Sequence, residues 1–150
     1  MKKIFAQDKQ QWSTSSFDDF RGSGAILFDM LVDSHPVKAV LDTGARHSIM
    51  NWKVAKMLGL SKTSATVNSE ITDAKGFHGG DPGTAYTTNL ASLSLVDEKV
   101  KANNIKMHID DMASFKPLLG DAAAVNLGID FFENRKLVID YANKIIAITQ

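Results

Sequence analysis

The chain has 150 residues, with 17 basic and 17 acidic side chains and a formal net charge of zero. Without a basic surplus it cannot hold nucleic acid by neutralising phosphates, and without cysteine it cannot form disulfides, thiolate nucleophiles or cysteine-ligated metal sites. Its length and its hydrophobic content of 44% predict one globular domain. No apolar run approaches the roughly 20 residues of a membrane span.

Residues 1–23 are polar and rich in Gln, Ser and Asp, which predicts an N-terminal arm before a domain formed by residues 24–150. The chain begins with Met1 and two lysines, as many export signals do, but it lacks the apolar stretch of about 7–15 residues that a signal peptide requires. The sequence therefore predicts a cytoplasmic protein with no membrane segment in this chain. A chain cut downstream of a signal or anchor, which would be periplasmic or membrane-anchored, would look the same.

Strand patterns dominate the domain. Apolar side chains alternate along residues 25–33, which is the period of a strand with one buried face. A Ser-His-Pro turn follows at residues 34–36, and residues 37–41 form a second short apolar run. These three segments predict a β-hairpin.

Helices are few and short in this pattern. Apolar residues at helical spacing predict one helix over residues 51–59, which Asn51 caps and Gly59 ends. A second short helix is predicted over residues 131–134. Four of the ten glycines fall within residues 76–83, which predicts a turn tip or a mobile loop. The other segments expected as strands are 63–75, 86–96, 100–109, 136–141 and 144–149. The predicted fold class is therefore all-β with one or two short helices.

The segment that carries candidate chemistry is Asp42-Thr43-Gly44-Ala45, directly after the predicted hairpin. Asp42 places a carboxylate in a tight turn at a strand end, and Gly44 lets backbone amides come close to it. The hydroxyl of Thr43 is available to lock the loop. A strand-end aspartate is also common as a purely structural turn residue, so these residues alone leave both interpretations open.

Two motifs together resemble the retropepsin-like aspartic proteases, the clan that includes the retroviral proteases. The first is the apolar strand that ends in Asp-Thr-Gly-Ala at residues 42–45. The second, Val-Asn-Leu-Gly-Ile-Asp-Phe-Phe at residues 125–132, is similar to the Leu-Gly-Met-Asp-Phe-Leu stretch of single-domain bacterial members. The resemblance spans residues 24–149 and implies a closed β-barrel or sandwich with a flap hairpin.

The resemblance implies that Asp42, Thr43 and Gly44 form the catalytic motif of an aspartic endopeptidase that acts on peptide or protein substrates. Because the chain has one such motif where the two-lobed pepsins have two, the site would form between two copies in a homodimer. Two adjacent carboxylates share one proton, so the ionised member activates water and the protonated member donates to the developing oxyanion. This chemistry needs no metal and no cofactor.

The resemblance also implies where a substrate would bind. Ala45 follows the catalytic motif and would line the substrate site. The glycine-rich loop at residues 75–83 lies where family members carry the flap, which closes over the substrate. The alternative for this loop is a solvent-exposed turn that contacts nothing. The candidate substrate-binding residues in the loop are Phe77, His78, Gly79 and Gly80.

Three residues depart from the family pattern. Arg46 stands where retroviral members have an aspartate that pairs with an arginine beside the later glycine, and Asp130 stands near that second place. The resemblance therefore implies an ion pair of reversed sign between Arg46 and Asp130, with a solvated arginine as the alternative. Asn126 replaces a more usual aliphatic residue in the second motif.

The sequence leaves one strong alternative to the endopeptidase, which is a non-catalytic dimerisation or peptide-docking module with the same fold. The intact Asp-Thr-Gly motif favours the enzyme, because a docking module has no need to bring two like charges together. A sugar or ester hydrolase with paired carboxylates would need a second acid nearby in the same chain, and none is evident. The four histidines never fall at the i, i+4 spacing of a helical zinc site, so no metal site is predicted.

Overall fold

The computed structural model describes residues 11–19, 22–72 and 83–150, and strands make up most of its regular structure. The strands are β1 (Trp12–Ser16), β2 (Asp18–Asp19), β3 (Ile26–Val32), β4 (His35–Leu41), β5 (Ile49–Asn51), β6 (Asn68–Thr72), β7 (Gly83–Leu95), β8 (Lys101–Asp110), β9 (Ala124–Leu127), β10 (Leu137–Asp140) and β11 (Ile145–Thr149). The helices are α2 (Trp52–Met57) and α3 (Lys116–Leu119), with 3₁₀ turns η2 (Ala113–Phe115) and η3 (Ile129–Phe132).

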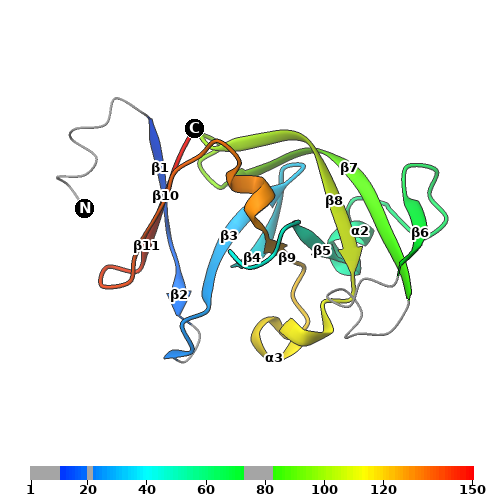
Figure 1. The fold of residues 1–150 in the computed structure, drawn as a ribbon, viewed down its shortest axis with the longest axis horizontal. Coiled ribbons are helices and arrows are strands. Elements are labelled where there is room, and N and C mark those ends of the chain that lie inside the picture. Colours follow the sequence, from blue (N-terminus) through cyan, green and yellow to red (C-terminus); the bar gives the residue numbers. More distant parts are fainter. Residues whose placement is uncertain (1–10, 20–21, 73–82) are drawn as a thin grey trace.

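Six strands close into a barrel in the order β3, β4, β9, β5, β8 and β7 (Figure 1). Antiparallel pairing of Met30–Val32 with Leu93–Leu95 joins β3 back to β7 and closes the ring. Two neighbouring pairs, β4 with β9 and β5 with β8, are parallel. The prediction of an all-β fold with a closed barrel is confirmed.

The predicted hairpin at residues 25–41 is confirmed, because Leu27–Val32 of β3 pairs with His35–Val40 of β4. Its turn is shorter than the sequence suggested. Asp33 and Ser34 both have positive φ angles, of 44° and 67°, as the two central residues of a tight hairpin turn require. His35 and Pro36 therefore lie in β4 rather than in the predicted turn at residues 34–36.

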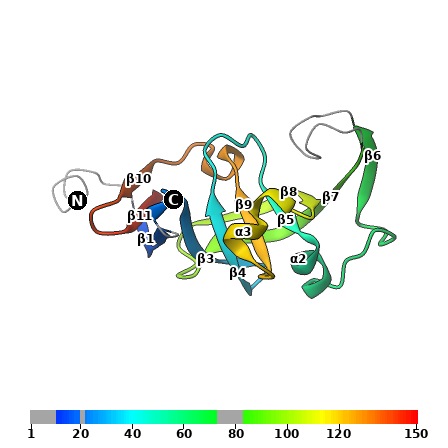
Figure 2. The same cartoon turned by 90° about the horizontal axis from the view of Figure 1, so that it is seen from below.

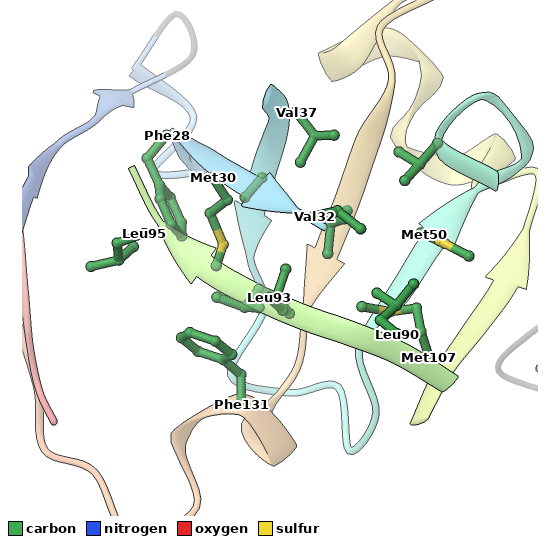
Figure 3. Packing of buried hydrophobic residues seen from close by; sticks show 14 of the residues in the cluster. Phe28, Met30, Val32, Val37, Met50, Leu90, Leu93, Leu95, Met107 and Phe131 are labelled. Atoms are coloured by element: carbon green, nitrogen blue, oxygen red, sulfur yellow. The ribbon is translucent and has the colours of Figure 1, made fainter. Parts of the chain in front are cut away.

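The barrel core follows from the alternation along β3, where Ile26, Phe28, Met30 and Val32 are all buried. Figure 3 shows Phe131 pointing from η3 toward Leu93. It also shows a second group of buried side chains at the other end of the core, formed by Met50, Leu90 and Met107. Each large apolar side chain buried in this way contributes roughly 1.5–3 kcal/mol, so the core holds the strand ends that carry the motifs.

The predicted first helix is confirmed as α2, which is shorter than residues 51–59. The Asn51 side chain accepts a hydrogen bond from the Val54 N–H at 3.1 Å and caps the helix, and Gly59 follows its end with φ of 73°. The second predicted helix, at residues 131–134, is instead the 3₁₀ turn η3. It begins two residues earlier, directly after Gly128.

The described part of the predicted arm packs against the domain. Strand β1 pairs with β11 in a separate three-stranded sheet, β1–β11–β10, which lies at the opposite end of the molecule from β6 (Figures 1 and 2). Phe17 is 4% exposed and belongs to the hydrophobic core, so it is not the peripheral residue that a polar arm implies. The boundary between residues 23 and 24 stays a prediction.

The region predicted as an exposed strand at residues 63–75 contains the shorter strand β6, and β6 is exposed as expected. Residues 73–82, with most of the predicted flap loop, lie outside the described residues. Among the helices that the structure describes, none has the length and apolar character to cross a membrane.

Candidate active site

The two sequence motifs meet at one end of the barrel. Strands β4 and β9 are parallel neighbours with Leu41 opposite Leu127, so their carboxyl ends lie side by side. Asp42 follows β4, Gly128 follows β9, and the Asp42 N–H donates to the Leu127 carbonyl at 3.0 Å. Asp42 therefore directly follows a strand that is fixed in the barrel by its neighbours.

The loop after β4 folds around the Asp42 carboxylate. The Gly44 N–H donates to Asp42 Oδ1 at 3.0 Å, and the Ala45 N–H donates to the Asp42 carbonyl at 3.1 Å. A Cβ atom on Gly44 would lie only 3.3 Å from the same carboxylate oxygen, so glycine allows the close approach that the sequence predicts. This contact is compatible both with a catalytic carboxylate and with a structural turn.

Gly128 lies where the two loops cross. A Cβ atom there would lie 2.7 Å from the carbonyl carbon of His47 and 2.9 Å from the carbonyl oxygen of Ala45. Its neighbour Ile129 donates an N–H to that Ala45 oxygen at 2.8 Å. Only glycine fits at this position, and the crossing fixes the Asp42 loop against the end of β9.

The predicted ion pair between Arg46 and Asp130 is wrong. The Asp130 carboxylate instead accepts two hydrogen bonds from Ser48, from its N–H at 2.8 Å and from its hydroxyl at 2.6 Å. The Ser48 hydroxyl in turn accepts the Gly128 N–H at 3.0 Å. Asp130 therefore ties the two loops together through a buried serine, and Arg46 is exposed.

Asn126 is a site residue that the sequence analysis treated only as a departure from the family pattern. It lies in β9, is 2% exposed, and its Nδ2 donates to Asp42 Oδ2 at 3.1 Å. The two carboxylate oxygens of Asp42 thus have different donors. Oδ1 accepts from Gly44 in the loop after β4, and Oδ2 accepts from Asn126 in β9. The signal that could have found it is a single amide between two aliphatic residues in an otherwise buried strand.

A cavity of about 580 Å³ opens beside the Asp42 carboxylate. Asp42, Gly44 and Ala45 of the predicted site line it, while Thr43 is exposed next to them. Other lining residues, which the sequence did not predict as cleft residues, include Arg46, His47, Ile49, Asp110, Phe115 and Asn126. The candidate flap residues Phe77, His78, Gly79 and Gly80 lie outside the described residues.

Two histidines form a pair of rings at the site, and one of them lies next to the Asp130 carboxylate. The ring centroids of His47 and His108 are 5.0 Å apart, and His47 Nδ1 is 3.9 Å from Asp130 Oδ2. Burial lowers the pKa of His108, and the positive charges of His47 and Lys106 lower it further. Within the described residues, no group of three or more His, Asp or Glu side chains is arranged to hold a metal ion.

Comparison with known proteins agrees with this geometry. The sequence profile of the family described as gag-polyprotein putative aspartyl protease matches residues 28–134. Because the match covers well over half of the chain, the protein belongs to this family of retropepsin-like aspartic proteases. No curated protein matches the sequence.

Solved structures with a similar fold include a retropepsin-like aspartic protease from Rickettsia conorii, with a TM-score of 0.60, 19% identity and 95% of each chain covered. The retroviral protease-like domain of Ddi1 from Leishmania major is also similar, with a TM-score of 0.46, 18% identity, and coverage of 79% of this chain and 82% of that one. At these identities the likeness to the Rickettsia structure shows the retropepsin fold alone.

Proposed function

We propose that the protein is an aspartic endopeptidase whose active site is completed by a second copy of the chain, with Asp42 of each copy forming the catalytic pair. The observation that carries the proposal is the Asp42 carboxylate at the wall of the cavity, with a hydrogen-bond donor on each of its two oxygens. A fixed carboxylate beside a cavity of this size is what activation of a substrate-bound water requires.

The chemistry explains the need for two chains. Peptide hydrolysis by this route takes a base that removes a proton from water and an acid that donates to the carbonyl oxygen. Two close carboxylates supply both, because like charges at short range cannot both ionise and the pair holds one proton. The bound water attacks the peptide carbonyl, and the proton passes to the leaving amine as the carbon–nitrogen bond breaks.

The surroundings of Asp42 support a site that continues into a partner. Thr43 is exposed beside Asp42, and among the described residues its hydroxyl has no hydrogen-bond partner, which leaves it available to a second copy. Among the described residues, Asp110 is the other carboxylate on the cavity wall, and its Oδ1 accepts the Met112 N–H at 2.8 Å. Asp110 is therefore the competing second acid, and it provides a matched control.

The decisive experiment compares Asp42→Asn with Asp110→Asn. The first substitution keeps the size of the side chain but removes its ionisable group, so we expect cleavage of peptide and unfolded-protein substrates to fall by orders of magnitude while the fold is retained. The second should keep measurable cleavage. Wild-type activity should follow a bell-shaped pH profile on the acid side of neutrality, and dilution should reduce it faster than linearly, with the mass in solution measured in parallel.

The alternative function is a non-catalytic dimerisation or peptide-docking module. The family and the fold are compatible with it, because a fold does not dictate chemistry. Peptide binding by wild type that Asp42→Asn leaves unchanged, together with no cleavage from acid to neutral pH, would favour this module. Undiminished cleavage by Asp42→Asn would make Asp42 a turn residue and overturn the proposal.

A further inference from the structure

We propose that Asn126 is a positioning residue for Asp42, whose carboxylate it orients through a hydrogen bond from its side-chain amide. The inference rests on the proposed function, since it concerns how the candidate catalytic carboxylate is held. It starts from the contact between Asn126 Nδ2 and Asp42 Oδ2 at 3.1 Å. The sequence marks Asn126 as an unusual amide in an apolar strand but does not indicate that Asp42 is its partner.

The contact completes a two-point hold on the carboxylate. Rotation about the last bond of an aspartate side chain is broad, so one hydrogen bond leaves the carboxylate plane poorly defined. The Gly44 N–H holds Oδ1 from the loop of Asp42 itself, and Asn126 holds Oδ2 from the neighbouring strand. Donors on both oxygens define the orientation of the carboxylate toward the cavity that both side chains line.

The donor sits on a rigid element. Asn126 is in β9, and its neighbours across the sheet are Val40 in β4 and Ile49 in β5. All four residues of β9 are buried. A side chain fixed between two barrel strands keeps its position when the substrate binds, whereas a donor on a loop would have to be ordered first.

The amide is costly for stability, which argues against a purely structural role. Asn126 lies between the fully buried Val125 and Leu127, and its Oδ1 has no hydrogen-bond partner among the described residues. A buried polar atom without a partner costs free energy, and an aliphatic side chain of similar size would avoid that cost. Local conflicts of this kind concentrate at functional sites.

The hydrogen bond has a chemical consequence. A carboxylate whose plane is fixed presents an oxygen to the bound water in the geometry that proton transfer requires. Loss of the donor should therefore reduce kcat, with a smaller change in KM. A residue that only supports the fold would lower activity only in proportion to the folded fraction, without this split between kcat and KM.

The experiment compares Asn126→Leu with wild type in the full-length chain. We expect kcat to fall about 10- to 100-fold, the range for loss of a hydrogen bond to a charged group, with a smaller change in KM. The thermal unfolding midpoint should stay equal or rise, because the unpartnered Oδ1 is removed. Asn126→Asp should retain a larger share of wild-type activity at acid pH than at neutral pH, because the introduced carboxyl group can donate a hydrogen bond only when it is protonated.

Asn51→Leu is the matched control, because Asn51 also lies beside β9 but serves the fold. Its amide donates to the Ala122 carbonyl at 2.8 Å and accepts the Ala124 N–H at 3.2 Å. We expect it to lower the unfolding midpoint and leave the kcat of the folded protein near wild type. A wild-type kcat in Asn126→Leu, while Asp42→Asn is inactive, would overturn this inference alone. Full activity of Asp42→Asn, or no cleavage by wild type, would overturn the proposed function and this inference with it.

Discussion

A hydrogen bond from a buried serine to an aspartate occurs in two regions of the structure. In the candidate active site the Ser48 hydroxyl donates to Asp130 at 2.6 Å, and in the three-stranded sheet β1–β11–β10 the hydroxyl of Ser13 donates to Asp97 at 2.5 Å. Both serines are buried, both aspartates are partly exposed, and both pairs join residues far apart in the sequence.

The two pairs differ in what they connect. Ser48 donates a second hydrogen bond from its backbone and accepts the Gly128 N–H, so its network includes both loops that meet at Asp42. Ser13 ties β1 to the turn between β7 and β8, where no candidate catalytic group lies. The comparison teaches that a buried serine–aspartate pair stabilises either region, but only the first pair can also control the position of the candidate carboxylate.

The largest effect is expected from Gly128→Ala, at the crossing of the two loops. The added Cβ would meet backbone atoms of His47 and Ala45 at 2.7–2.9 Å, and a backbone cannot move aside as a flexible side chain can. We expect the free energy of unfolding to fall by about 3 kcal/mol or more and cleavage to be lost. Denaturant unfolding and a peptide cleavage assay measure the two effects.

Gly59→Ala is the control for this prediction. Gly59 has a positive φ of 73° but open space around its position, so alanine there costs only the backbone strain of roughly 1–2 kcal/mol. It lies at the end of α2, away from Asp42, and cleavage should persist. Equal losses of stability and activity in the two variants would contradict a specific role for the loop crossing.

A smaller effect is expected from Ser48→Ala, and Ser13→Ala tests the comparison directly. Each substitution removes a hydrogen bond to a charged group, so we expect each to lower the free energy of unfolding by about 1–2 kcal/mol. Ser48→Ala should also lower kcat, because it releases the loops beside Asp42, while Ser13→Ala should leave kcat near wild type. Equal effects on kcat would show that the Ser48 pair has no closer link to the site.

The sequence predicts the barrel strands well, because they depend on local patterns, and the catalytic role of the Asp42 motif stays a prediction. The alternation along β3 and the capping of α2 by Asn51 are visible in consecutive residues, and the second motif marks the strand that lies beside Asp42. The position of the turn at Asp33 and Ser34 was predicted wrongly. Its two central residues have a left-handed backbone, but neither is a glycine, which is the usual sequence signal for that conformation. The segment with η2 and α3 was missed, since helices of three or four residues are too short to show a period.

The contacts of the candidate site were less predictable. The resemblance to the family implies that Arg46 pairs with Asp130, but the crossing of the loops places Ser48 against that carboxylate instead. In the sequence, Asn126 is only a polar residue in an apolar strand. The parallel pairing of β4 and β9 in the structure places it beside Asp42. Such pairings depend on which strands become neighbours, and no local pattern carries that information.

The smallest effect concerns pH and the histidine beside the Ser48–Asp130 pair. Burial and the charges of His47 and Lys106 hold the pKa of His108 below its ordinary 6.5, against the opposing effect of Asp130 and Glu70. Between the folded and unfolded pKa values the unfolded chain binds more protons, so this contribution to stability is present above about pH 6.5 and decreases as pH falls through that range. In His108→Gln, the thermal unfolding midpoint should therefore decrease less steeply than in wild type as the pH falls below neutral. Above neutral pH, the dependence of the midpoint on pH should change little. An identical slope in wild type and variant would mean that His108 takes up its proton equally in both states.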